Sequence, residues 1–118
     1  MHQGAQSHRR LDLRSLAMHR AIAAKLRCGL EPIEIAIRNL DRWAPSANHS
    51  APYLEQWRKI LALPVEEIAA LLEEDSERMA ALRQASPFAG VLSPQERWSI
   101  YDTFAIGTYH PGSGDHIG

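Results

Sequence analysis

The sequence predicts an all-α fold, a compact bundle of five to six short helices flanked by flexible tails. Apolar residues recur at spacings of three and four in successive segments, which is the period of an α-helix. Proline and glycine separate these segments, and no segment alternates apolar and polar residues as a strand does. The 118 residues suffice for one hydrophobic core. We therefore expect a single helical domain at 11–106, a flexible basic tail at 1–10 and a flexible tail at 107–118.

The first two helices are predicted from apolar stripes and from the residues that end them. The first spans residues 11–27 and is stopped by Gly29. Its stripe holds Leu13, Leu16, Ala17, Ile22, Ala24, Leu26 and Cys28. Pro32 suits the first turn of the second helix, which should end near Trp43 because Pro45 disfavours helical geometry at the preceding residue. The apolar side of the second helix holds Ile33, Ile37 and Leu40.

Three short helices should follow. The third is opened by Ser50 or Pro52 and broken by Pro64, and the fourth covers residues 65–72. The acidic run 73–75 is unfavourable at a helix C-terminus, so it should lead into a fifth helix capped by Asp75 or Ser76. The core side chains expected from these helices are Leu54, Trp57, Ile60, Leu61, Val65, Ile68, Ala69, Leu72, Met79 and Leu82.

The clearest local signal lies at residues 86–101. Ser93 is a candidate N-cap, Pro94 occupies the first helical position and Glu96 follows three residues after the cap. A capping box should therefore begin the sixth helix. The loop before it is rich in apolar residues, so it must lie on the core. Those residues are Phe88, Val91 and Leu92. The apolar side of the sixth helix should hold Trp98, Ile100, Tyr101 and Phe104, with Trp98 in the core.

Residue patterns typical of enzymes and metal sites are not found. The sequence has no Gly-rich phosphate loop, no zinc-spaced Cys or His pair and no nucleophile elbow, so we expect no enzymatic activity, cofactor or metal. His110, Asp115 and His116 lie in a Gly-rich tail that would not preorganise a metal site. We expect His19 to be exposed or to cap a helix, and the single Cys28 to be buried. A solvated face should carry Glu66, Glu67, Glu73, Glu74, Asp75 and Glu77.

The charge is unevenly distributed along the chain. The net charge is −1, yet the first 44 residues are basic and the remainder is acidic. Such asymmetry is typical of a nucleic-acid contact or of a charge-complementary protein partner, although a solvated helix face is the alternative. The residues expected to contact a partner or nucleic acid are Arg9, Arg10, Arg14, Arg20, Lys25 and Arg27.

A helix-turn-helix at residues 68–79 is the motif most worth testing. Leu72 and Met79 fit its core positions, but its turn would be the acidic run 73–75. The second helix would present acidic side chains to the phosphate backbone, which dominates DNA affinity. The basic first helix is the better DNA-binding candidate.

Three segments resemble parts of small, uncharacterised bacterial helical proteins that are encoded beside toxin genes and regarded as antitoxin-like. These segments are residues 13–26, 74–78 and 86–101. The likeness covers about residues 11–104. It implies a non-enzymatic protein that caps a partner toxin and often binds its own operator.

We therefore predict a cytoplasmic protein-interaction module, antitoxin-like, that neutralises a partner toxin. The lack of a membrane span, of a secretion signal and of paired cysteines underlies the cytoplasmic location. The alternatives are a DNA-binding transcriptional regulator that uses the basic first helix, and a small enzyme or ligand-binding bundle. The sequence leaves open whether the chain forms a homo-oligomer.

Overall fold

The computed structural model describes residues 2–108, with side chains described for residues 12–104. Its elements, in chain order, are α1 (His2–Leu26), α2 (Glu31–Trp43), the 3₁₀ turn η1 (Ala44–Ser46), α3 (Ala51–Leu61), α4 (Val65–Leu72), α5 (Glu77–Gln84) and α6 (Pro94–Thr108). No strand occurs in these 107 residues, so the all-α prediction is confirmed. No helix within this range is long and apolar enough to cross a lipid bilayer.

The first helix begins at His2, nine residues before the expected start at residue 11. Residues 2–10 contain no proline, and their one alanine, two glutamines and two arginines are good helix formers. A helix that is already nucleated extends through such residues at little cost. The helix therefore starts earlier than predicted, because helix propensity does not require an apolar stripe. The flexibility of the tail at 1–10 stays a prediction. The tail with His110, Asp115 and His116 lies outside the described residues.

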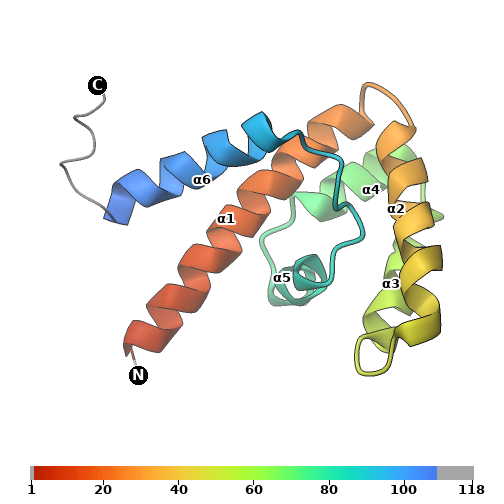
Figure 1. Cartoon of the computed structure of the whole chain (residues 1–118), viewed down its shortest axis with the longest axis horizontal. Coiled ribbons are helices and arrows are strands. Elements are labelled where there is room, and N and C mark those ends of the chain that lie inside the picture. The colour runs from red at the N-terminus through yellow and green to blue at the C-terminus, as the bar shows by residue number, and fades with distance from the viewer. Residues whose placement is uncertain (1, 109–118) are drawn as a thin grey trace.

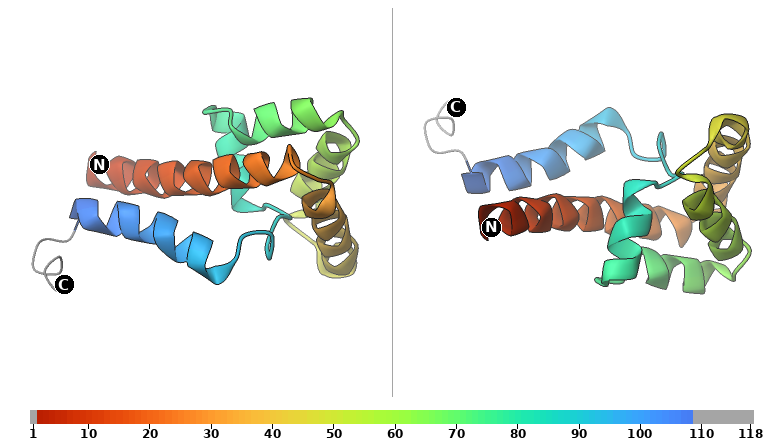
Figure 2. Two further views of the ribbon diagram at one scale, coloured as in Figure 1. Left: turned by 90° about the horizontal axis from the view of Figure 1, so that it is seen from above. Right: turned by 90° about the horizontal axis from the view of Figure 1, so that it is seen from below.

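Helix α1 is the central element, and it contacts α2, α4, α5 and α6. Figure 1 shows α2–α5 gathered around its C-terminal half. Helix α6 runs back along α1 in the opposite direction, and both views in Figure 2 show the pair extending away from α2–α5. We call α6 together with residues 2–20 of α1 the α1/α6 arm.

The core lies where α2–α5 pack against α1. Trp57 is completely buried, and its indole N–H donates to the carbonyl of Leu82 at 2.9 Å, so the buried polar group is satisfied. The other buried apolar side chains of α1 to α5 are Leu16, Ile22, Ala23, Leu26, Ala36, Leu40, Leu54, Ile60, Ile68, Ala69, Leu72, Met79 and Leu82. Most of the side chains predicted for the core are therefore in it.

The loop at residues 86–92, which we call the anchor segment, lies on this core as predicted. Phe88 is 2% exposed and meets Trp57 edge-to-face, with ring centroids 5.8 Å apart. The buried Asn39 amide of α2 donates to the carbonyls of Pro87 at 2.8 Å and Ala89 at 3.0 Å. Gly90 turns the chain at φ +92°, a conformation that other L-residues rarely adopt. The anchor segment is thus held by apolar burial and by satisfied backbone polar groups.

Four side chains predicted to lie on buried stripes are exposed, and Ala24 of α1 is one of them. Trp98 is 68% exposed, because α6 packs mainly against α1 and Trp98 points away from that contact. Ile37 is 41% exposed on the outer side of α2. Cys28 is exposed because α1 ends at Leu26, which places Cys28 in the turn after the helix rather than on its buried stripe.

Both predicted helix caps are present. The hydroxyl of Ser93 accepts from the Glu96 backbone N–H at 3.1 Å, and the Glu96 carboxylate accepts from the Ser93 N–H at 2.7 Å. Glu96 also pairs with Lys25 at 3.1 Å, and these contacts, the Ser93 N–H first, lower the pKa of Glu96. Ser76 caps α5 by accepting from the Met79 N–H at 3.2 Å.

We expect Ser93→Ala to lower the free energy of unfolding by about 1 kcal/mol, since one backbone N–H loses its partner. Glu96→Ala should remove part of the same reciprocal motif, so the losses of the double variant should be smaller than the sum of the single losses. Urea unfolding of the four proteins measures this coupling. Strictly additive losses would show that the two contacts act separately.

Candidate functional site

The six basic residues predicted as contacts do not form one free positive surface. Arg9 and Arg10 lie in α1, but their side chains are outside the described part of the chain. Arg20 is exposed. Lys25 pairs with Glu96 across to α6, with its Nζ 3.1 Å from Oε1. The remaining two, Arg14 and Arg27, are engaged in contacts of their own.

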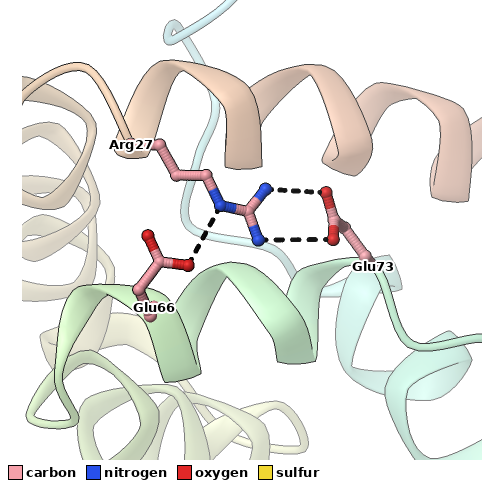
Figure 3. Close-up of polar contacts among 3 residues, drawn as sticks. All are labelled: Arg27, Glu66 and Glu73. Carbon is pink, nitrogen blue, oxygen red and sulfur yellow. Dashed lines mark hydrogen bonds and ion pairs between the residues drawn. The ribbon is translucent and has the colours of Figure 1, made fainter.

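Arg27 ties the end of α1 to α4 (Figure 3). Its Nε donates to Glu66 at 3.2 Å, and its two terminal nitrogens donate to Glu73 at 3.0 and 3.5 Å. These hydrogen bonds, with Glu73 first, raise the pKa of Arg27. Three of the five N–H donors of this guanidinium are thus used, and its charge is offset by two carboxylates. Arg27 is therefore a fixed contact between helices and is not free for a phosphate.

Arg14 takes part in an aromatic cluster at the arm, formed by Arg14, Tyr101 and Trp98. The Arg14 guanidinium carbon lies 4.8 Å from the centroid of the Tyr101 ring, a cation–π geometry. Trp98 meets the same ring edge-to-face, with centroids 6.3 Å apart and an interplanar angle of 79°. Tyr101 is half-buried between them, whereas Trp98 is exposed. The cluster therefore presents an indole that is held in place and open to solvent.

His19 was expected to be exposed or capping, and this was wrong: it is 4% exposed. Its Nδ1 lies 2.8 Å from the Ser15 carbonyl, which can only accept, so Nδ1 carries the proton. Nε2 then accepts from the Ser86 hydroxyl at 2.8 Å. Burial, with a smaller contribution from the positive charge of Arg83, lowers the pKa of His19 to about 4, against the opposing Ser15 hydrogen bond. The neutral ring joins α1 to the anchor segment.

The two helices of the tested helix-turn-helix contact each other, but they do not offer a basic reading surface. Arg83 of α5 is 3% exposed, and it donates from Nη1 to the carbonyl of Glu74 at 2.8 Å and more weakly to that of Leu72 at 3.5 Å. The exposed side chains include Glu67 and Glu77. Phosphate contact through α5 is therefore unfavourable.

Several hollows lie beside α1, and two of them are lined in part by the anchor segment. The larger, about 580 Å³, opens between the end of α1, the start of α2 and the anchor segment, with Cys28 on its wall. The smaller, about 200 Å³, lies between α1, the anchor segment and α6. No group of three His, Cys, Asp or Glu side chains among the described residues could hold a metal ion.

We expect the stability of the protein to fall as the pH is lowered through the titration of His19. The unfolded chain binds a proton at its ordinary pKa of 6.5, whereas the folded chain stays neutral until about pH 4. The unfolded state therefore gains protons first, and the free energy of unfolding should drop by about 2 kcal/mol between pH 7.5 and pH 5. Urea unfolding at both pH values measures the drop.

His19→Gln should be less stable at pH 7.5 but should lose most of this pH dependence. His49→Gln, a change at an exposed histidine of the connector before α3, should keep the wild-type dependence. Equal pH dependence in the wild type and His19→Gln would mean that His19 is not buried as a neutral ring.

Comparison of the chain with protein families, with curated proteins and with solved structures finds no match. The likeness to antitoxin-like proteins therefore stays a prediction from the sequence. What the protein does must be argued from the geometry of the arm, the anchor segment and the charges between them.

Proposed function

We propose that this protein is a non-enzymatic interaction module that binds another protein through the exposed side of the α1/α6 arm. The observation that carries the proposal is the 68% exposed indole of Trp98, held on Tyr101, which in turn lies under Arg14. Tryptophan, tyrosine and arginine are the residues that dominate binding energy at protein interfaces. A preordered cluster of all three loses little side-chain entropy when a partner docks.

The packing of α6 also favours a partner. From Pro94 to Phe104 no side chain of α6 is buried, although the helix carries Trp98, Ile100, Tyr101 and Phe104. Trp98 is the most exposed of the large apolar side chains in the described region. Most helical stability comes from burying an apolar face, and α6 leaves much of that area uncovered. A docked protein would bury this exposed apolar area.

The charge of the arm indicates what kind of protein fits. Residues 2–20 of α1 carry four arginines against the single carboxylate of Asp12. A second copy of the chain would bring two positive first helices together, which like-charge repulsion disfavours. The complementary partner is a different protein that offers an apolar pocket for Trp98 with an acidic rim for the arginines. An antitoxin-like role, with a toxin as this partner, is the specific form that we propose.

Operator DNA is the weaker alternative. DNA affinity grows with the number of phosphates neutralised by free Lys and Arg side chains. Lys25 and Arg27 are already paired with carboxylates, and Arg14 lies over Tyr101. An exposed tryptophan on α6 also has no part in a phosphate contact made by α1.

The test is a binding titration with the purified partner, obtained by co-purification with the native chain or from the product of the adjacent gene. We expect Trp98→Ala to weaken binding at least about 30-fold, the effect of losing a central interface residue. Tyr53→Ala is the matched control, because Tyr53 is an exposed aromatic residue on α3, outside the arm. This control should bind as the wild type does.

Circular dichroism melts of both variants should match the wild type closely, since neither side chain is buried. A Trp98→Ala protein that binds the partner within about threefold of the wild type would contradict the proposal. A log affinity for operator DNA that falls steeply with log salt and is insensitive to Trp98→Ala would favour the regulator instead.

A further inference from the structure

The smaller hollow, about 200 Å³ in volume, has a mainly apolar lining that also includes two arginines. Arg83 and Arg97 line it from α5 and α6, Ser15 lines it from α1, and Tyr101 adds a phenol. Met18, Ile22 and Leu92 supply apolar walls. An apolar hollow with a few polar side chains on its lining is typical of a ligand site.

One of the buried donors lining this hollow has no acceptor. Arg83 is 3% exposed, and its Nη1 donates to the carbonyls of Leu72 and Glu74. Its Nε–H is buried and has no hydrogen-bond partner among the described residues. A buried charged donor without an acceptor costs free energy, and such groups are rare in folded proteins. Arg83 therefore has bonding capacity that the fold does not use.

The charged side chains around Arg83 indicate which kind of hydrogen-bond acceptor would bind beside it. Burial lowers the pKa of its guanidinium, but an arginine stays charged near neutral pH. The carboxylates of Asp12, Asp75 and Glu74 act on it from the sides of α1 and α4, and Arg20 adds a positive charge. Because those carboxylates already offset much of the positive charge, a dianion such as phosphate would meet repulsion. A singly charged acceptor fits better.

We infer that this hollow binds a carboxylate group, with Arg83 and Arg97 as its cationic donors. The hydroxyls of Ser15 and Tyr101 lie on the same lining and can add hydrogen bonds. A volume of about 200 Å³ is below the range of pockets for drug-sized ligands, so the group belongs to a short carboxylic acid or to a single acidic side chain. The site does not depend on the proposed function, although Tyr101 belongs to both.

The probe is sodium propionate, titrated into the full chain at pH 7 and constant ionic strength. The readout is the backbone amide resonances of Ser86 and residues 88–92, because Pro87 has no N–H. We expect saturable shifts that sodium chloride does not reproduce and that sodium phosphate reproduces more weakly. Arg97→Gln should weaken propionate binding at least about tenfold, since it removes one charged donor from an exposed, substitutable position. Arg38→Gln, an exposed arginine of α2 outside the hollow, is the matched control and should leave binding unchanged.

The absence of saturable shifts up to about 100 mM propionate would overturn the inference and leave water as the occupant. Equal weakening by Arg97→Gln and Arg38→Gln would also overturn it, because the effect would then be one of general charge. Competition separates the two sources of carboxylate. If propionate displaces the protein partner, the site takes an acidic side chain of that partner; if both bind together, it takes a free acid. The competition arm uses the partner of the proposed function, whereas the propionate titration and the Arg97→Gln comparison do not depend on that partner.

Discussion

The docking of the anchor segment against the core is the constraint on which the rest of the structure depends. Phe88 fills the space between Trp57 and His19, at centroid distances of 5.8 and 6.3 Å. The amide of Asn39 holds two carbonyls of the segment, and the neutral ring of His19 holds Ser86. Because α6 begins just after this segment, the anchor segment fixes where α6 starts beside α1, and the contacts of Glu96 with Lys25 and of Tyr101 with Arg14 hold the helix there. The anchor segment therefore links the α1/α6 arm to the core that α2–α5 form with α1.

In this arrangement, the residues that fill the core are separate from the exposed aromatic cluster of the arm. The body formed by α2–α5 and the C-terminal half of α1 contains most of the buried apolar side chains, whereas α6 keeps its aromatic residues at the surface. The cation–π and edge-to-face contacts of Arg14, Tyr101 and Trp98 order the exposed indole without burying it. A helix that need not complete a core is free to serve a partner, which is the basis of the proposed function.

Much of the fold follows from the sequence, because caps and apolar stripes are local. The capping box of Ser93 and Glu96 and the burial of Phe88 were predicted in this way and are confirmed.

The residues of the candidate site were harder to predict from the sequence. At 100° per residue, Trp98 lies about 160° from Ile100 around α6, so the two cannot face one core, and helical spacing alone argues against burying both. His19 lies in the stripe of Leu16, Ala23 and Leu26 at spacings of three and four, which indicates burial. The pairing of Arg27 with α4 depends on tertiary packing, and no local pattern reveals it.

The most direct test of this account compares the unfolding free energies of Phe88→Ala and Trp98→Ala, two aromatic truncations ten residues apart on either side of the α6 N-cap. Phe88→Ala should cost about 3–5 kcal/mol, the range for a buried aromatic side chain. Trp98→Ala should cost less than about 1 kcal/mol, as expected for a surface residue. If Trp98→Ala were instead the more destabilising of the two in urea unfolding at neutral pH, α6 rather than the anchor segment would hold the fold together, and the account would be wrong.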